Sequence, residues 1–388
     1  MRIAQMLDTL SQGGAQRMQV FLVESLQPLG VELTVISLRE PSKSPYLERL
    51  QAAGARVVSF PFPRLFSPGA FINLVKFLSH EKFDLLHAYL TYSNIVGSMA
   101  GRLTGTPTIA SLRNADKQGV SYTPKRAMLE VFAMRYLATR VMANGIAVAE
   151  VARKRLNNAR KVDVIPNAVD LIPSIPEDER RLLRQAVLGD PGRKFILSVG
   201  RLTAAKGFHD LIDAFALVHA QDGLAALVIA GGGDLRNELN EHVAHLGLTG
   251  HILLLGPRDD VPKLLAAADI YVNSSHWEGT PVSVLEAMAA GLPVVATRVG
   301  ENPYLLEPDA GLVVQANQPA ELASALLTLL ASDVKRQSLG QAARERIGHS
   351  YSRVTWQKSL LALYSEITPE AKPYLEAVLQ NSLQACGV

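Results

Sequence analysis

The sequence predicts an α/β fold in which two doubly wound, Rossmann-like domains face each other across a cleft. The chain has 388 residues, which is long enough for two domains. Hydrophobic residues make up 48% of it and charged residues 19%, proportions that allow sizeable cores. Short β-like runs alternate with helix-like segments in both halves, an order that produces parallel sheets with helices on both faces. Ligands bind such sheets at the carboxyl ends of the strands, so the cleft is the expected site.

The first half begins this alternation at once. Strands are predicted from short apolar runs at Met1–Leu7, Glu32–Leu38, Arg56–Phe60, Leu85–Ala88, Thr108–Leu112 and Arg140–Ala143. Helices are predicted between them at Ala15–Leu29, Tyr46–Ala53, Pro68–His80, Ser93–Leu103 and Ala127–Ala138. Gly30 and Gly54 each follow a predicted helix, where glycine commonly ends helices.

A stretch rich in proline and acid, Leu171–Asp178, predicts a linker, and the alternation restarts after it. Strands are predicted at Phe195–Val199, Ala226–Ala230, Ile252–Leu255, Ile270–Asn273 and Val294–Thr297. Helices are predicted at Phe208–Ala220, Leu235–Leu246, Val261–Ala267 and Val282–Ala290. We therefore expect an N-terminal domain at residues 1–170, a C-terminal domain at 171–352 and a helical segment at 353–388.

Several classes of protein are disfavoured by simple features. No run of 18 apolar residues occurs, which excludes a membrane-spanning helix. Asp8 comes too early for the core of a signal peptide. The single cysteine, Cys386, excludes an internal disulfide framework and a cysteine metal cluster. These features lead us to expect a protein of the reducing cytoplasm.

Charge is divided unevenly along the chain. Residues 1–170 contain 21 Lys and Arg against 12 Asp and Glu, a net charge of +9, whereas residues 171–388 contain 18 against 24. A basic half indicates that the first domain meets an anionic partner. Drift in surface composition is the alternative explanation.

Two glycine-rich loops follow predicted strands. Gly13 and Gly14 lie between the first strand and the first helix, where the backbone can approach a phosphate at a helix N-terminus. Gly232 is the middle of three glycines after a strand of the second domain and suits close approach to a nucleotide. Tight or flexible turns are the alternatives for both. No G-x-G-x-x-G occurs, which disfavours a pyridine-nucleotide dehydrogenase.

The second domain places cations and acids near the ends of its strands. Arg201 and Lys206 lie between a strand and a helix, where they could neutralise a diphosphate; an ordinary solvated loop is the alternative. Glu278 lies in a turn before a helix, whose first residues offer free N–H groups to an anion. Glu286 lies within that helix among apolar neighbours, so it needs a partner, and a ribose would provide two hydroxyls.

In these residues the chain resembles retaining, family-4-type glycosyltransferases with the GT-B fold, from residue 1 to about residue 365. Glu278 and Glu286, with seven residues between them, match the E-x7-E motif of that family. Arg201 and Lys206 match its diphosphate-binding pair. Other matches are the glycine loop at Gly13 and Gly14, and the stretch with Arg258 that passes the donor base.

The resemblance implies metal-independent transfer of a sugar from a nucleotide-diphosphate donor, with no cofactor besides this substrate. Arg201, Lys206 and Glu278 would be catalytic. The donor would be bound by Gly13, Gly14, Gly232, Arg258, Gly279, Thr280, Pro281, Val282 and Glu286. The acceptor would be a glycan or lipid-linked molecule of bacterial surface polysaccharide or glycolipid synthesis, and not nucleic acid. The helical segment Arg353–Ile367, with apolar residues at Trp356, Leu360 and Tyr364, would return to the N-terminal domain.

On the acceptor side the sequence departs from the family. Arg113, followed by Asn114, stands where many members have a histidine near the reacting centre, and arginine is a poor proton acceptor. His87 ends a predicted strand and is a further acceptor-side candidate, with a structural role as the alternative. We assign no general base.

Two alternative functions would use the same nucleotide-sugar pocket that these motifs predict. They are a hydrolysing nucleotide-sugar epimerase and a non-catalytic nucleotide-sugar-binding protein. Peripheral contact with an anionic membrane at its inner face is also expected from the basic first half. In the segment Lys125–Val141, however, Met128, Phe132 and Leu137 form no clean apolar stripe. We therefore expect that contact to be purely electrostatic.

Overall fold

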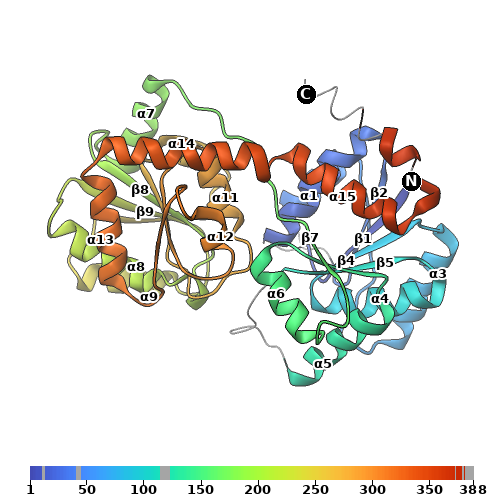
Figure 1. Cartoon of the computed structure of the whole chain (residues 1–388). Coiled ribbons are helices and arrows are strands. Elements are labelled where there is room, and N and C mark those ends of the chain that lie inside the picture. The colour runs from blue at the N-terminus through green and yellow to red at the C-terminus, as the bar shows by residue number, and fades with distance from the viewer. Residues whose placement is uncertain (11–13, 41–44, 114–122, 372, 378–379, 381–388) are drawn as a thin grey trace. The chain divides into compact units, whose positions relative to one another are not determined.

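The computed structural model describes the chain except residues 11–13, 41–44, 114–122, 372, 378–379 and 381–388 (Figure 1). The chain divides into two compact units. Unit 1 comprises Met1–Asn167 together with Arg353–Val388, and unit 2 comprises Ala168–Ser352. Among the described residues, no helix has the length and apolar character needed to cross a membrane.

The described residues of unit 1 form a seven-stranded sheet in the order β3-β2-β1-β4-β5-β6-β7, and every pair of neighbouring strands is parallel. The strands are β1 (Arg2–Leu7), β2 (Glu32–Ser37), β3 (Arg56–Ser59), β4 (Leu85–Tyr89), β5 (Thr108–Leu112), β6 (Arg140–Ala143) and β7 (Val162–Val164). The strand order reverses between β1 and β4, so their carboxyl ends border the crevice where such sheets bind ligands.

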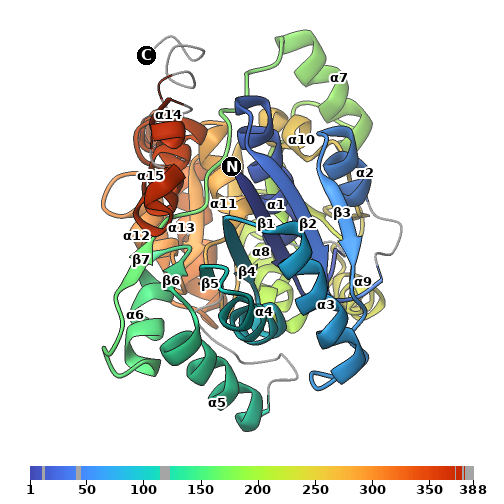
Figure 2. The same cartoon turned by 90° about the vertical axis from the view of Figure 1, so that its right-hand side faces the viewer.

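Helices cover both faces of this sheet. They are α1 (Gly14–Leu26), α2 (Pro45–Ala52), α3 (Pro68–Glu81), α4 (Thr91–Thr104), α5 (Pro124–Phe132), α6 (Ile146–Arg155) and α15 (Arg353–Ile367), with short turns η1 (Gln27–Leu29), η2 (Ala133–Leu137) and η4 (Pro369–Ala371). Helix α1 contacts α2 and α15, whereas α4 contacts α3 and α5. Right-handed crossovers place these two groups on opposite faces (Figure 2).

Helix α4 packs closely on the sheet because two of its residues are glycines. A Cβ atom at Gly97 would lie 3.2 Å from the Ala88 Cβ, and one at Gly101 would overlap the Thr108 hydroxyl. The hydrophobic cluster under α4 includes Met6, Leu86 and Val96, as expected for a parallel sheet that is covered on both faces.

Helix α15 packs on α1 within unit 1 (Figure 1). The Trp356 ring meets the Phe21 ring edge-on with 5.4 Å between centroids. The Gln357 side chain donates a hydrogen bond to the Ser25 carbonyl oxygen at 2.9 Å. Trp356, Leu360 and Tyr364 are buried. The apolar spacing of this segment thus gives α15 one face that unit 1 covers.

The described residues of unit 2 form a six-stranded parallel sheet in the order β10-β9-β8-β11-β12-β13. Its strands are β8 (Lys194–Val199), β9 (Ala225–Ala230), β10 (Ile252–Gly256), β11 (Ile270–Asn273), β12 (Val294–Thr297) and β13 (Leu312–Val314). Its helices are α7 (Glu177–Leu188), α8 (Phe208–His219), α9 (Arg236–His245), α10 (Val261–Ala267), α11 (Val282–Ala289), α12 (Asn302–Leu306), α13 (Pro319–Leu330) and α14 (Asp333–Ser350), with the turn η3 (Ala204–Lys206). Here the order reverses between β8 and β11.

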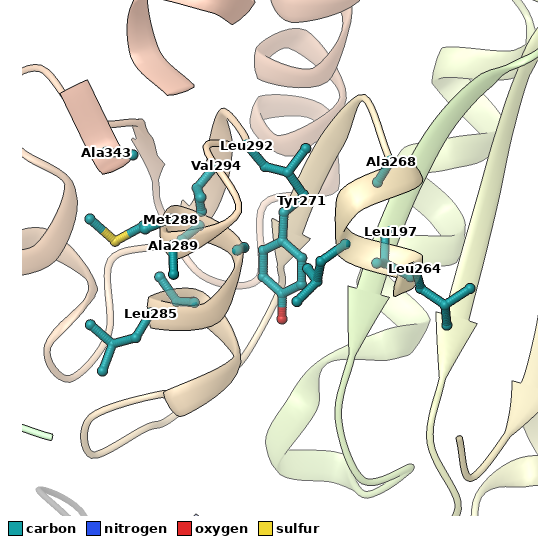
Figure 3. Close-up of a cluster of buried hydrophobic side chains, with 14 of the residues drawn as sticks. Leu197, Leu264, Ala268, Tyr271, Leu285, Met288, Ala289, Leu292, Val294 and Ala343 are labelled. Atoms are coloured by element: carbon teal, nitrogen blue, oxygen red, sulfur yellow. The ribbon is translucent and has the colours of Figure 1, made fainter. Parts of the chain in front are cut away.

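Tyr271 lies at the centre of one core cluster of unit 2. Figure 3 shows its ring between Leu285 of α11 and Leu264 of α10, and Tyr271 is fully buried. Its hydroxyl donates to the Val199 carbonyl oxygen at 3.4 Å. Burial raises the pKa of this hydroxyl well above its usual value, so it remains a donor. The cluster therefore fixes α11 against the carboxyl end of β8.

The structure differs from the sequence prediction at several elements. The predicted linker continues only to Pro176, because α7 begins at Glu177. Three acids in the first turn of α7 suit the positive end of a helix. The predicted helix over 127–138 is α-helical only to Phe132 and then continues as the π turn η2. The short strands β7 and β13 were not anticipated.

Candidate active site

The loop after β8 and the glycine-rich loop after β9 pack directly against each other. The Leu202 amide donates to the Gly232 carbonyl oxygen at 2.9 Å, and a Cβ atom at Gly231 would overlap the Gly200 carbonyl oxygen. A Cβ atom at Gly232 would lie 2.9 Å from the Pro257 ring. These contacts explain why the loop needs glycine. Nucleotide contact at Gly232 stays a prediction.

Lys206 is paired with Glu278 across the switch point of the unit 2 sheet. The Lys206 ammonium donates to Glu278 Oε1, and the Ser275 hydroxyl donates to the same oxygen at 2.8 Å. The side chains of Lys206 and Glu278 are only 22% and 12% exposed. Since Lys206 follows β8 and Glu278 follows β11, the sheet order brings the two together. The pair holds the ammonium in one place.

The backbone around Lys206 is fixed by a second set of contacts. The Ser274 hydroxyl donates to the Lys206 carbonyl oxygen, and the His276 amide donates to the Ala205 carbonyl oxygen, each at 2.9 Å. Gly207 has a φ of +59°, and a Cβ atom there would overlap the Ser274 carbonyl oxygen. Only glycine fits this position, and the cation-bearing loop is consequently preorganised.

Arg201 differs from Lys206 because its side chain is exposed. Within the described part of the chain, no group forms a hydrogen bond or ion pair with its guanidinium. An unengaged guanidinium in the same loop as a fixed ammonium gives two positive charges with which to bind an anion.

The turn from Glu278 to Val282 leads into α11. The Glu301 amide donates to the Gly279 carbonyl oxygen at 3.0 Å, and a Cβ atom at Gly300 would lie 2.6 Å from the Glu278 carbonyl oxygen. Thr280 and Pro281 are buried before the first helical residue, Val282. The loop after β12 thus supports the turn from one side.

Glu286 lies in the second turn of α11 and is 4% exposed. This burial excludes the interpretation of Glu286 as an ordinary surface residue.

Arg258 is engaged with an acid of its own loop. Its guanidinium donates to both oxygens of Asp260, at 2.7 and 2.6 Å. The Asp260 carboxylate raises the pKa of Arg258 and is itself held at a lowered pKa. Arg258 follows β10, the edge strand, whereas Lys206 follows β8. A role in donor binding stays a prediction.

His87 is fully buried in β4, with both ring nitrogens engaged. Nδ1 lies 2.9 Å from the hydroxyls of Tyr364 and Tyr89, and Nε2 lies 2.6 Å from the Ser111 hydroxyl. Burial lowers the pKa of His87 well below its usual value, so the ring is neutral. These contacts favour a structural role over contact with an acceptor, since His87 joins α15 to β4 and β5.

Arg113 follows β5 and is half-buried. Its guanidinium stacks over the Tyr89 ring at 4.5 Å and donates to the Asn167 side-chain oxygen at 2.9 Å. Its Nε is buried without a hydrogen bond to any described residue.

The remaining predicted residues of unit 1 are Gly13, Gly14 and Asn114. Gly14 is exposed at the start of α1. Two further predicted residues, Gly13 and Asn114, lie outside the described residues.

Asp8, at the carboxyl end of β1, was not identified as a site residue from the sequence. Its carboxylate accepts from the Ser93 amide and hydroxyl, each at 2.7 Å, and from the Tyr92 amide at 3.2 Å. Asp8 therefore caps α4 from another element. Burial raises the pKa of this carboxyl to about 6 despite these hydrogen bonds. Its place at the end of the first predicted strand is the sequence signal that could have identified it.

Comparison with known proteins gives the family. The model for Glycosyltransferase Family 4 matches residues 12–172, and that for Glycosyl transferases group 1 matches residues 179–346. The chain is 28% identical over 308 residues to an Escherichia coli UDP-Gal:alpha-D-GlcNAc-diphosphoundecaprenol alpha-1,3-galactosyltransferase, with 76% of this chain and 79% of that protein covered. It is 30% identical over 349 residues to a Mycobacterium leprae phosphatidyl-myo-inositol mannosyltransferase, with 86% and 88% covered.

Solved structures show the same fold. Anabaena Alr3699/HepE, in complex with UDP-glucose, matches with a TM-score of 0.84 and 23% identity, over 94% of this chain and 99% of that one. WaaG, from lipopolysaccharide biosynthesis, matches with a TM-score of 0.73 and 17% identity, over 95% and 100%. The predicted family and fold are thereby confirmed. The chain belongs to the family-4 glycosyltransferases, has their GT-B fold and is a hexosyltransferase.

Proposed function

We propose that this enzyme transfers a hexose from a UDP-sugar to a lipid-linked glycan acceptor, with retention of configuration and without a metal ion. The observation that carries this proposal is the cationic loop after β8. There, Lys206 is fixed by Glu278, and Arg201 is not engaged. A leaving diphosphate is the group in this reaction that needs two positive charges.

The chemistry follows from where charge develops. When the bond between the anomeric carbon and the diphosphate oxygen breaks, the oxygen gains negative charge. Preorganised cations lower the energy of that transition state more than that of the ground state. Lys206 meets this condition because Glu278, which itself accepts a hydrogen bond from Ser275, holds it before any substrate arrives. Glu278 then acts as a positioning residue for Lys206, in addition to the expected contact with the donor sugar.

The remaining donor contacts are assigned by position. The N–H groups of Gly279 and Thr280, in the turn that leads into α11, would face the anionic donor. Glu286, inside α11, would accept hydrogen bonds from the hydroxyls of the ribose.

Two protein cations, Arg201 and Lys206, supply the positive charge that a divalent metal ion supplies in other transferases, so we expect the reaction to be independent of metal. Activity should be unchanged after dialysis against EDTA. A loss that Mg²⁺ restores would contradict this part of the proposal.

The choice of substrates is supported by relatives. The E. coli relative is named for UDP-Gal and a diphosphoundecaprenol acceptor, and the M. leprae relative for a phosphatidyl-inositol acceptor. The Anabaena structures contain UDP or UDP-glucose. Both named acceptors are lipids with phosphate. The net charge of +9 in residues 1–170 suits such acceptors and peripheral contact with the inner face of a membrane.

Thermal stabilisation by nucleotides is the first test. UDP should raise the melting temperature of the chain more than GDP or ADP, and UDP-galactose and UDP-glucose should then be compared in transfer to a short-chain GlcNAc-diphospho-lipid. Stabilisation by GDP or ADP alone would overturn the choice of UDP. Conversion of UDP-GlcNAc in the absence of acceptor would favour an epimerase instead.

A further inference from the structure

Three large apolar side chains form an exposed line on the outer surface of α5 and η2. Met128, Phe132 and Tyr136 are 68%, 51% and 60% exposed. We call these three residues the ridge. Exposed apolar side chains that stand alone are common, but a contiguous set on a surface marks an interaction site.

The three residues of the ridge lie next to one another along the segment. The three residues follow one another at intervals of four, which places each next to the previous one on a helical surface. The rings of Phe132 and Tyr136 are in contact, with 5.2 Å between centroids. The sequence-based expectation assumed a regular helix through Leu137. The structure has a π turn at Ala133–Leu137 instead, and Phe132 and Tyr136 remain in contact across its start.

The ridge is not needed by the core of unit 1. The opposite side of the same segment provides the buried residues Glu130, Ala133 and Met134. Helix α4 contacts both α5 and η2, and α4 and α5 lie side by side in Figures 1 and 2. The apolar side chains of the ridge therefore face away from the fold.

Charges around the ridge are positive. Lys125 is exposed, and the Arg135 guanidinium lies over the Tyr136 ring at 5.3 Å. The segment 124–137 contains one acid, Glu130, which is 2% exposed and accepts a hydrogen bond from the Asn94 side-chain amide at 3.2 Å. The neighbouring helix α4 has no acid and exposes Arg102. In α4 and in residues 124–137, which the structure describes, the exposed charges are all cations, and a row of apolar side chains beside cations is complementary to an anionic lipid surface.

We propose that the ridge inserts into the boundary between headgroups and acyl chains of an anionic bilayer, with Lys125 and Arg135 at the lipid phosphates. This inference extends the proposed function, because a lipid-linked acceptor lies at such a surface. It differs from the expectation of a purely electrostatic contact, because it adds an apolar contribution. A second copy of the chain is a poorer occupant, since three side chains provide far less than the roughly 1,000 Å² that a stable protein interface needs.

Vesicle binding of the full chain tests the proposal. The ridge variant carries Met128→Ser, Phe132→Ser and Tyr136→Ser. The control variant carries Leu182→Ser, Leu224→Ser and Val334→Ser, whose side chains in unit 2 are 70%, 69% and 77% exposed. Each is sedimented with vesicles of phosphatidylglycerol and phosphatidylcholine, and with vesicles of phosphatidylcholine alone, at low and high salt.

The wild type and the control variant should bind the anionic vesicles and keep part of this binding at high salt. The ridge variant should lose at least about 10-fold in affinity and all of the salt-resistant part, because the apolar contribution is gone. Equal binding by wild type and ridge variant would overturn the proposal. So would wild-type binding that high salt abolishes completely.

Insertion is tested separately by fluorescence quenching with lipids brominated on their acyl chains. Phe132→Trp should be quenched above the background of Trp277 and Trp356, whereas Leu182→Trp should not. A Phe132→Trp signal that remains unquenched would contradict insertion. Sedimentation velocity without vesicles tests the alternative that the ridge binds a second copy of the chain. A wild-type protein that is dimeric, together with a ridge variant that is monomeric, would show that the ridge is a dimer interface and would overturn the proposal of membrane insertion.

Failure of the proposed function is distinguishable from failure of this inference. The ridge variant should transfer sugar to a water-soluble acceptor at the wild-type rate and lose activity only with vesicle-bound acceptor. If no UDP-sugar is used by any form while vesicle binding depends on the ridge, the proposed function fails and the docking surface stands.

Discussion

Replacing Lys206 by alanine removes the ammonium that the structure holds against Glu278. Loss of one preorganised charge contact to a developing oxyanion typically lowers turnover by roughly 10²–10³-fold, which corresponds to about 2.7–4 kcal/mol. Lys206 fits this class because its ammonium and backbone are both fixed, the latter through Ser274. Lys206→Ala should therefore lower kcat by about that factor, with the smaller effect on KM.

The variant also affects stability. It leaves the Glu278 carboxylate, which is 12% exposed, with the Ser275 hydroxyl as a remaining partner. An unpaired, partly buried acid costs about 1–3 kcal/mol. Glu278→Gln removes the charge but keeps an oxygen for both donors, so its effect on kcat should be nearer about 10-fold. If Glu278 acts only by positioning Lys206, then the double variant should be no slower than Lys206→Ala.

The assay is release of UDP at saturating UDP-sugar and acceptor. Lys263→Ala is the matched control, because Lys263 is 62% exposed in the same unit and pairs only weakly with Glu179 at 3.4 Å. Full turnover by Lys206→Ala would refute the assignment of the leaving-group cation. A double variant much slower than Lys206→Ala would refute positioning as the sole role of Glu278 and indicate its direct contact with the donor sugar.

Three other variants probe separate parts of the structure. Glu286→Ala should raise the Kd for UDP, measured by calorimetry, while unchanged UDP affinity would contradict contact with the ribose. Asp8 has a folded pKa of about 6 against 3.8 for the free group, so its contribution favours folding at low pH and is lost as pH rises from about 4 to 6. Relative to Asp8→Asn, the wild type should lose about 2–3 kcal/mol of unfolding free energy over that range in urea titrations, and a constant difference would exclude this linkage. Trp356→Ala should destabilise unit 1 by roughly 3–5 kcal/mol, and an unchanged melting temperature would contradict the packing of α15 on α1.

The alternation of apolar strands and helices was readable from the sequence because period and turn residues are local properties. Strands β5, β6 and β11 begin and end where they were predicted. The three-residue strands β7 and β13 were not, since so few residues carry no clear period. The first two residues of α7, Glu177 and Asp178, were included in the predicted linker because this acidic stretch has the composition of a loop, although acids suit a helix N-terminus.

The site was predictable in its residues but not in its contacts. Motif spacing singled out Lys206 and Glu278, yet it could not show that they bond to each other. That contact depends on β8 and β11 being neighbours in the sheet, which is a tertiary property. Likewise, the glycines after β9 suggested a ligand, whereas the structure shows that they allow contact with the loop after β8.

The stereochemistry and rate of sugar transfer test the central claim most directly. Proton NMR of the product from a UDP-α-hexose and a GlcNAc-diphospho-lipid would report both, for the wild type and for Lys206→Ala. The account predicts an α-linked product that forms with the wild type and accumulates roughly 10²-fold or more slowly with the variant. A β-linked product, or equal rates for the two proteins, would contradict it.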